Sequence, residues 1–192
     1  MRKFEIGLKE KIHFIGIGGI GMSGLAQVMK TMGFNVQGSD LTLSKNVERC
    51  KKIGIKVFKT HSRQNINDSS IVVRSTAIKN NNPEIKAAKE RKINILKRAE
   101  MLAQVVSLKT NIVITGSHGK TTTTSLISKV LTSSGIDPTI INGGVINSFK
   151  SSARLGKGEW AVLEADESDG SFLKLPINYS VITNIDEEHL DY

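Results

Sequence analysis

The architecture of this chain is set by a short segment near its start, which reads Lys11-Ile12-His13-Phe14-Ile15-Gly16-Ile17-Gly18-Gly19-Ile20-Gly21. The run Lys11–Ile17 predicts a buried strand, and the glycines predict a tight turn at its end. Apolar residues then recur at helical spacing, up to a glycine that would end the helix: Leu25, Val28, Met29, Met32 and Gly33. The segment therefore predicts a strand, a glycine turn and a helix, as in the opening of an α/β unit.

The turn itself has the pattern Gly16-x-Gly18-x-x-Gly21, which matches the fingerprint of dinucleotide-binding loops. Its glycines let a pyrophosphate approach the backbone, and the N–H groups that open the following helix favour the negative charge. Asp40 ends the second predicted strand, where an acid can bond a ribose hydroxyl. NAD is the default ligand, but another diphosphate such as a UDP-sugar meets the same requirements. The loop alone does not distinguish these ligands.

A second phosphate loop, Gly116-Ser117-His118-Gly119-Lys120-Thr121-Thr122-Thr123, follows another predicted strand. It departs from the usual Walker spacing, which needs a glycine where Ile114 stands. Its working groups are still present, because the glycines free the backbone to wrap phosphates, Lys120 offers a positive charge and Thr121 a hydroxyl for Mg²⁺. The position of His118 inside the loop favours contact with an anionic ligand. We therefore expect the loop to bind ATP.

Two acidic segments follow later strands. Glu164-Ala165-Asp166-Glu167-Ser168-Asp169 ends an apolar strand, as a Walker B element does when it sets a carboxylate beside the Mg²⁺ of ATP. The alternative is a solvated acidic turn. The second segment, Asn184-Ile185-Asp186-Glu187-Glu188-His189-Leu190-Asp191, contains a histidine that by itself is more typical of a surface residue. Both segments lie after strand ends, where α/β sheets collect ligands.

Strands and helices alternate along the chain, which predicts α/β units with parallel sheets. The pattern restarts near residue 109. We therefore predict a Rossmann-like domain over residues 1–108 and the beginning of a P-loop-type ATP-binding domain over residues 109–192. Ser44 is expected to cap one helix and Pro83 to open another. The helix at 121–134 is expected to carry its apolar residues on one side: Leu126, Ile127, Val130 and Leu131.

Composition argues against several classes of protein. The net charge of +9 is spread among asparagines without interleaved aromatic residues, so we interpret it as a solvated basic surface rather than a nucleic-acid interface. The single cysteine, Cys50, excludes an internal disulfide framework and a multi-cysteine zinc site, and we expect it to be a small apolar residue. No run approaches the roughly 18 apolar residues of a membrane span, so we expect a cytoplasmic protein without membrane insertion.

Taken together, these motifs resemble the Mur ligases of bacterial peptidoglycan synthesis, nearly continuously from Ile12 to Tyr192. The resemblance is carried by His13 to Ala26, by Ser75-Thr76-Ala77-Ile78, by Arg98-Ala99-Glu100-Met101-Leu102, by the second phosphate loop and by Glu164 to Phe172. The first glycine loop followed by Met22-Ser23-Gly24-Leu25-Ala26 is highly specific, as is the acidic block. The first loop would then receive the UDP part of UDP-N-acetylmuramate rather than NAD.

The resemblance also implies roles for individual residues. Those expected at the nucleotide sugar are Gly16, Gly18, Gly19, Gly21, Met22, Ser23, Asp40, His61, Ser75, Arg98 and His118. Those expected at ATP are Gly116, Ser117, His118, Gly119, Lys120, Thr121 and Thr122. Mg²⁺ would be held by Thr121, Glu167 and His189, and the catalytic residues would be Lys120, Glu167 and His189.

The reaction implied by the nearest motifs joins L-alanine to the muramyl carboxylate through an acyl phosphate, with ATP and Mg²⁺. Ser117 stands where the family usually has threonine, which is a mild departure. The chain ends at Tyr192, within the family's central domain and before its C-terminal domain, so we expect binding of UDP-N-acetylmuramate but little or no turnover. The alternatives are a sister ligase that attaches a preformed peptide to the same sugar, and a non-catalytic NAD-binding module. The oligomeric state stays open.

Overall fold

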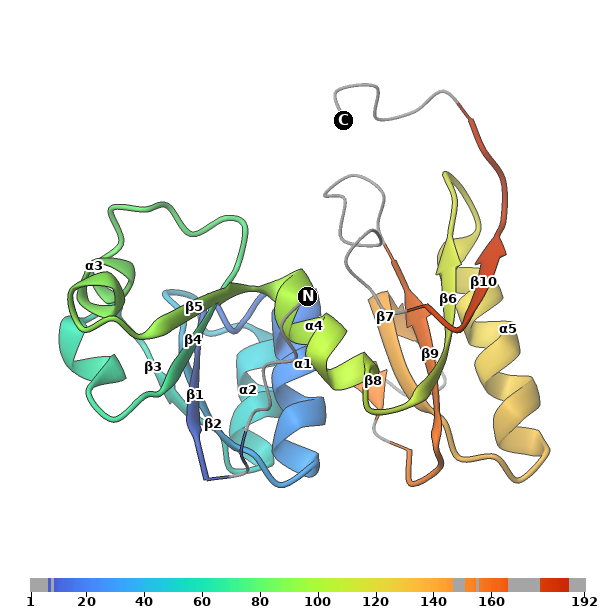
Figure 1. Ribbon diagram of the computed structural model, residues 1–192, viewed down its shortest axis with the longest axis horizontal. Helices are drawn as coiled ribbons and strands as arrows, with labels where there is room; N and C mark the ends of the chain where they lie inside the picture. The colour runs from blue at the N-terminus through green and yellow to red at the C-terminus, as the bar shows by residue number, and fades with distance from the viewer. Residues whose placement is uncertain (1–6, 8, 147–150, 155, 166–176, 187–192) are drawn as a thin grey trace. The chain divides into compact units, whose positions relative to one another are not determined.

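The computed structural model describes residue 7 and residues 9–146, 151–154, 156–165 and 177–186. The chain divides into two compact units, residues 1–101 and 102–192, which are drawn in Figure 1. The predicted domain boundary lies at 108–109, a few residues beyond this division. The two units are described separately below.

The first unit is built on a five-stranded parallel sheet with the order β3-β2-β1-β4-β5. Its strands are β1 (Lys11–Ile15), β2 (Asn35–Ser39), β3 (Lys56–Phe58), β4 (Ile71–Arg74) and β5 (Asn94–Lys97). The chain runs outward from β1 to β3 on one side and then returns to β4 on the other. The strand order therefore reverses between β1 and β4, and open α/β sheets bind ligands beyond the carboxyl ends of the strands at such a point.

The helices of the first unit are α1 (Ile20–Thr31), α2 (Lys45–Lys52), the short 3₁₀ helix η1 (Arg63–Ile66), α3 (Pro83–Glu90) and α4 (Arg98–Val106), which continues past residue 101. Figure 1 shows α1 and α2 on one face of the sheet and α3 on the other. The expected cap is confirmed, since the Ser44 side chain accepts a hydrogen bond from the Val47 N–H. Pro83 also opens α3 as expected, directly after Asn82, whose side chain caps the helix.

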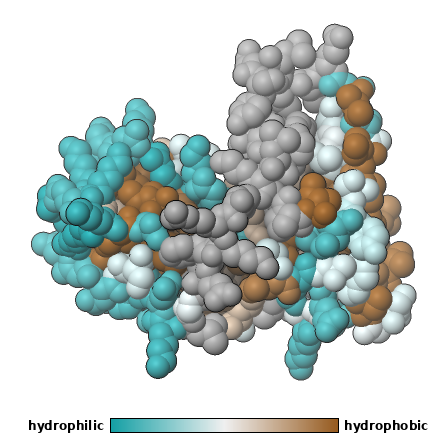
Figure 2. Space-filling view, viewed as in Figure 1, coloured by the Kyte–Doolittle hydropathy of each residue, from teal (hydrophilic) through white to brown (hydrophobic). Residues whose placement is uncertain are grey.

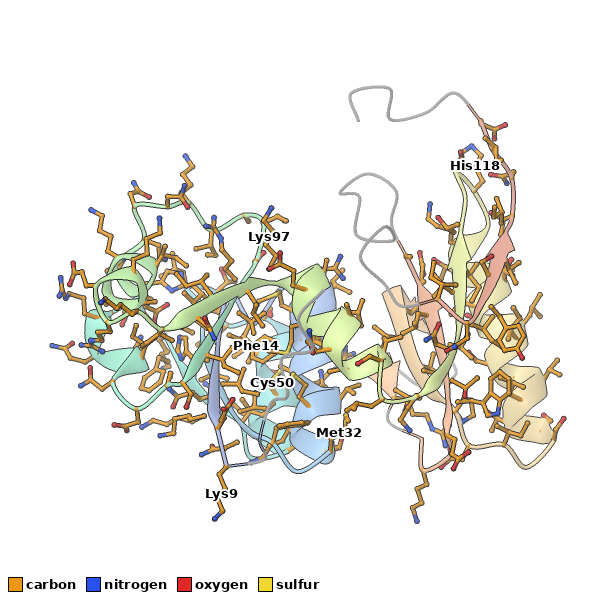
Figure 3. The ribbon with its side chains drawn as sticks, in the orientation of Figure 1. Lys9, Phe14, Met32, Cys50, Lys97 and His118 are labelled. Atoms are coloured by element: carbon orange, nitrogen blue, oxygen red, sulfur yellow. The ribbon has the colours of Figure 1, made fainter. Side chains whose placement is uncertain are left out.

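Apolar residues fill both faces of this sheet. Ile15 belongs to a buried cluster between the sheet, η1 and α3, together with Ile66, Val72, Ile85, Ala87 and Ala88. Because side chains alternate along a strand, Phe14 lies on the opposite face, toward α1 and α2. Figure 3 shows Phe14 and Cys50 in that layer, and Cys50 is fully buried, which confirms its expected character as an apolar residue.

The second unit is built on another five-stranded sheet, with the order β10-β6-β9-β7-β8. Its strands are β6 (Thr110–Thr115), β7 (Thr139–Ile146), β8 (Ser151–Arg154), β9 (Trp160–Glu164) and β10 (Tyr179–Ile182). All neighbours are parallel except β7 and β8, which form an antiparallel pair. The parallel α/β class is confirmed, but β8 and the second half of β7 were not predicted, because this glycine- and serine-rich stretch lacks an apolar alternation.

The only helix among the described residues that belongs wholly to this unit, α5 (Lys120–Ser133), packs on β6, β7 and β9. The expected apolar side of α5 is wrong in part. The fully buried residues are Thr124 and Ser128, whereas Leu126 and Val130 are 63% and 62% exposed. At 100° per residue, Leu126 lies on nearly the opposite side of the helix from Thr124, so the apolar residues span two faces. Figure 2 shows apolar surface over α5 and β10.

Among the described residues, no helix is both long enough and apolar enough to cross a membrane.

Candidate nucleotide-binding sites

The first glycine loop joins the carboxyl end of β1 to the start of α1. Gly16 has a φ of +78°, which glycine adopts without strain, and the N–H groups of Gly16 and Ile17 both donate to the Ser39 carbonyl oxygen. Gly19 is the N-cap of α1, and its own N–H donates to the Gly16 carbonyl. The loop is therefore a closed turn that directs the first N–H groups of α1 toward the carboxyl edge of the sheet.

Three of the residues predicted at the nucleotide sugar surround this loop, and each explains one glycine. A side chain at position 16 would meet Cβ of Ser75 at 3.2 Å. One at position 18 would meet the Asp40 carboxylate at 2.8 Å, and one at position 21 would meet the Arg98 guanidinium at 2.9 Å. The structure thus brings Asp40, Ser75 and Arg98 around the glycines, from three separate parts of the chain.

The Asp40 carboxylate has a structural task that the sequence did not reveal. One oxygen accepts from the Gly18 N–H at 2.8 Å, and the other accepts from the Thr42 N–H at 2.9 Å. Asp40 therefore ties the glycine loop to the turn after β2. A carboxylate oxygen has a second lone pair, so a ribose hydroxyl can still donate to it.

Two other residues predicted at the nucleotide sugar have side chains that point into the core. The side chains of Met22 and Ser23 are almost fully buried, and the Ser23 hydroxyl donates to the Ile20 carbonyl. The Ser23 N–H also donates to the Gly19 carbonyl, so a main-chain contact of this pair with a ligand would have to come from the Met22 N–H. His61 follows β3 and lies beside the end of β2, where its Nδ1 contacts Ser39 and Glu84.

The second phosphate loop joins β6 to α5. Gly116 and Gly119 have φ values of +124° and +80°, and α5 begins immediately afterwards at Lys120. The Lys120 ammonium donates to the carbonyls of Gly116 and Ser117, so it folds back over its own loop. Thr122 is exposed on the first turn of α5.

The segment after β10 holds this loop in place. The Asn184 side chain accepts from the His118 N–H at 2.8 Å and donates to the His118 carbonyl at 3.1 Å, and the Thr183 hydroxyl also donates to that carbonyl. The imidazole of His118 stays exposed at the tip, 3.9 Å from the Asp186 carboxylate, and Figure 3 shows it there. A side chain on Gly116 would meet Thr183 and Asn184, so this glycine is required by the bracing segment.

The structure adds Glu164 to the predicted ATP site. Glu164 ends β9, which lies beside β6, and the Thr121 hydroxyl is 3.1 Å from each Glu164 carboxylate oxygen. A threonine hydroxyl and a carboxylate are oxygen ligands of the kind that Mg²⁺ prefers. The sequence shows that the acids begin at Glu164 but not which of them lies beside Thr121. The signal that could have singled out Glu164 is its position as the last residue of the predicted strand.

Other parts of the predicted metal site lie outside the described residues, namely Glu167 and His189. Within the described part of the chain, no group of three or more His, Cys, Asp or Glu side chains could hold a metal ion. The roles assigned to Glu167 and His189 therefore stay predictions.

Each unit is a largely parallel α/β structure with a glycine loop at the carboxyl end of a strand, and this combination is typical of nucleotide-binding proteins. Family models agree and are more specific. The catalytic domain of the Mur ligase family matches residues 11–110, and the Mur ligase middle domain matches residues 114–192. The chain belongs to the Mur ligase family, which confirms the resemblance in its sequence.

Curated relatives are named UDP-N-acetylmuramate–L-alanine ligase. The one from Pelagibacter ubique is 60% identical over 99% of this chain and 41% of its own length. That from Mesorhizobium japonicum is 55% identical over 94% of this chain and 39% of its own length. This chain thus spans about two fifths of the length of these relatives.

Solved structures show the same fold. The UDP-N-acetylmuramate-alanine ligase of Thermotoga maritima superposes with a TM-score of 0.86 at 35% identity, covering 94% of this chain and 43% of that one. The UDP-N-acetylmuramate:L-alanyl-gamma-D-glutamyl-meso-diaminopimelate ligase of Neisseria meningitides has the same TM-score at 27% identity, covering 94% and 62%. These similarities confirm the predicted fold class.

Proposed function

We propose that this chain forms the nucleotide-sugar and ATP-phosphate sites of an ATP- and Mg²⁺-dependent ligase. The reaction joins L-alanine to the muramyl carboxylate of UDP-N-acetylmuramate in peptidoglycan synthesis. The observation that carries the proposal is the contact of Thr121 with Glu164 at the foot of a Gly-Lys-Thr loop. A module that only binds NAD does not need a threonine hydroxyl and a carboxylate placed together in this way. Because the reaction consumes ATP, its expected compartment is the cytoplasm.

The residues of the second unit fit the activation of a carboxylate by ATP. Lys120 would leave the loop carbonyls that it contacts and neutralise phosphate charge, because an ammonium is attracted more strongly to a phosphate than to two carbonyl dipoles. Thr121 and Glu164 would hold Mg²⁺, which when bound neutralises charge on the phosphates. Glu167 and His189 would complete the metal site, as the sequence predicts.

The residues of the first unit fit a nucleotide diphosphate. The pyrophosphate would lie against the glycine loop and the N-terminus of α1, where Arg98 packs on Gly21. Asp40 and His61 lie farther along the carboxyl edge, after β2 and β3, on the side where a nucleoside would extend. L-Alanine is favoured over a preformed peptide because relatives at 54–60% identity carry the alanine ligase name.

Thermal-shift measurements on the 192-residue chain test the proposal with UDP-N-acetylmuramate, Mg-ATP and NAD as ligands. We expect the first two ligands to raise the melting temperature and NAD to leave it unchanged. Stabilisation by NAD alone would contradict the proposal. The low turnover expected of this chain also stays a prediction, which a coupled phosphate-release assay with L-alanine checks.

Two variants test which unit binds which ligand. Lys120→Ala should remove the shift with Mg-ATP and keep that with UDP-N-acetylmuramate, and Arg98→Ala should do the reverse. Lys129→Ala on the exposed face of α5 and Arg91→Ala at the end of α3 are the matched controls, since both remove a surface cation away from the loops. Equal effects of Lys120→Ala and Lys129→Ala would show that only general charge attracts ATP.

A further inference from the structure

A buried carboxylate in the first unit has no part in the proposed chemistry. Glu84 lies in the first turn of α3, and its side chain is fully buried. One of its oxygens accepts from the Ser39 hydroxyl at 2.6 Å and lies 3.0 Å from Nδ1 of His61. The other accepts from the Asn65 amide at 2.7 Å and lies 3.3 Å from Nε2 of His13. Two histidines thus share one buried carboxylate.

The carboxylate is ionised at neutral pH. Burial by itself would raise the pKa of Glu84, but hydrogen bonds from His13, Ser39 and Asn65 outweigh this effect and hold the pKa below its ordinary value. Glu84 therefore carries no proton, and every group that approaches its oxygens has to donate.

The proton of His13 follows from its other neighbour. The Gln37 amide nitrogen lies 2.7 Å from the Asn65 carbonyl oxygen, which can only accept, so the orientation of this amide is fixed. The same nitrogen lies 3.3 Å from both Nδ1 of His13 and the Ser69 hydroxyl, and an amide nitrogen cannot accept a hydrogen bond from Nδ1. Neutral His13 therefore has its proton on Nε2, toward Glu84.

The same reasoning applies to His61. Its Nδ1 lies 3.0 Å from both the Glu84 carboxylate and the Ser39 hydroxyl. Ser39 has one proton, and its shorter contact to Glu84 uses it, so neither neighbour can donate to Nδ1. His61 must therefore carry a proton on Nδ1. Because the two nitrogens lie on different edges of the ring, Nε2 points away from the carboxylate and, in neutral His61, carries the acceptor lone pair of the ring.

The position of His61 suggests what uses that lone pair. Ser39 is the last residue of β2 and directly precedes Asp40, which holds the glycine loop. We propose that Glu84 is a positioning residue that fixes His61 as the Nδ1–H tautomer, so that Nε2 accepts a hydrogen bond from an O–H or N–H group of the nucleoside of the bound nucleotide sugar. The identity of the ligand rests on the proposed function.

Nitrogen NMR of the ligand-free chain tests the tautomer directly. The chain has 4 histidines, so the His61 signals can be assigned by comparison with His61→Gln. At pH 8 we expect the ¹⁵N shifts of a protonated Nδ1 and an unprotonated Nε2. A wild-type chain with the His61 proton on Nε2 would overturn the proposal without any variant of Glu84.

Binding measurements test the consequence. In Glu84→Gln, an amide N–H₂ would face groups that have to donate, so we expect a mixed His61 tautomer and about tenfold weaker binding of UDP-N-acetylmuramate by calorimetry. Glu90→Gln, on the exposed end of the same helix, should match the wild type in both measurements. An unchanged tautomer and affinity in Glu84→Gln would overturn the proposal.

A double variant separates positioning from a general effect on the fold. In a His61→Ala background, Glu84→Gln should cause no further loss of affinity; a full tenfold loss there would show that Glu84 does not act through His61. If Glu84→Gln does not fold, Ser39→Ala serves instead, and it should keep the Nδ1–H tautomer because the carboxylate remains. A wild-type chain that binds no UDP-N-acetylmuramate overturns the proposed function, whereas an Nε2–H tautomer overturns the role of Glu84 alone.

Discussion

The hydroxyl of Thr121 and the carboxylate of Glu164 meet at the start of α5, 3.1 Å apart. The hydroxyl donates its hydrogen to the carboxylate. A bound Mg²⁺ would receive both oxygens instead, since each has lone pairs for it. This contact links the end of β9 to the loop proposed to hold the phosphates, and it is the reason why we propose Glu164 as a Mg²⁺ ligand.

Glu164→Gln should therefore weaken the binding of Mg-ATP by about tenfold or more, because an amide is a poorer Mg²⁺ ligand than a carboxylate. Calorimetric titration of Mg-ATP is the measurement. Glu159→Gln, just before the start of β9, is the control and should bind as the wild type does. If Glu164→Gln bound Mg-ATP normally while Glu167→Gln did not, the Mg²⁺ ligand would be Glu167, as the sequence predicts, and not Glu164.

Cys50 allows a second test at this scale. Burial raises the pKa of its thiol to about 12, so at pH 8 only about one molecule in ten thousand has the reactive thiolate. We expect an aromatic disulfide reagent to label native protein no faster than it unfolds, and to label the denatured chain at once. Rapid labelling of folded protein, with circular dichroism unchanged, would contradict the packing of α2 on α1.

At the scale of elements, the N-terminus of α3 carries a pH dependence. The pKa of Glu84 is lower in the folded chain than the ordinary 4.5, so the unfolded chain binds a proton first on acidification. Its contribution to stability is complete above the ordinary pKa and is lost as the pH falls through the folded pKa. Urea denaturation between pH 6 and pH 3 should show a steeper loss in wild type than in Glu84→Gln. Equal slopes in the two proteins would show that the carboxylate is not linked to folding.

The strand β10 and the segment after it form a second functional element. Thr183 and Asn184 form hydrogen bonds with the main chain of His118 in the phosphate loop. Asn184→Ala should speed hydrogen exchange at the His118 amide and weaken Mg-ATP binding several-fold, because a looser loop loses more freedom on binding. Ser180→Ala, exposed on β10, is the control. Unchanged exchange at His118 would mean that the brace does not order the loop.

At the scale of the whole molecule, both units have the same arrangement of a sheet, a glycine loop and a helix. Each has a five-stranded sheet, and in each a glycine loop leads from the carboxyl end of a strand into a helix N-terminus. The first loop is surrounded by Asp40, Ser75 and Arg98, and the second by Thr183, Asn184 and Glu164. The two loops share this place in the fold but differ in backbone conformation, since the N-cap Gly19 is extended and the N-cap Gly119 is left-handed, and different neighbouring segments supply the side chains around each.

The α/β class, both glycine loops and most strands and helices followed from the order of the residues alone. Local signals are sufficient there, because the apolar runs, the glycines after strands and the helix-start residues Ser44 and Pro83 act over a few neighbouring positions. The antiparallel strand β8 and the exposed side of α5 could not be predicted this way. Both depend on which surfaces pack together in the folded chain. The apolar character of Leu126 does not by itself indicate whether this residue is buried or exposed.

Contacts between distant residues required the tertiary structure. The sequence by itself indicates no role for Glu84, yet folding places it between two histidines, one from β1 and one from the segment after β3. Likewise, nothing near Thr121 in the chain singles out Glu164, which lies beside it because β6 and β9 are paired strands. Hydrogen bonds and ion pairs act over a few ångströms in space. The spacing of residues along the sequence does not show which of them come that close when the sheets form.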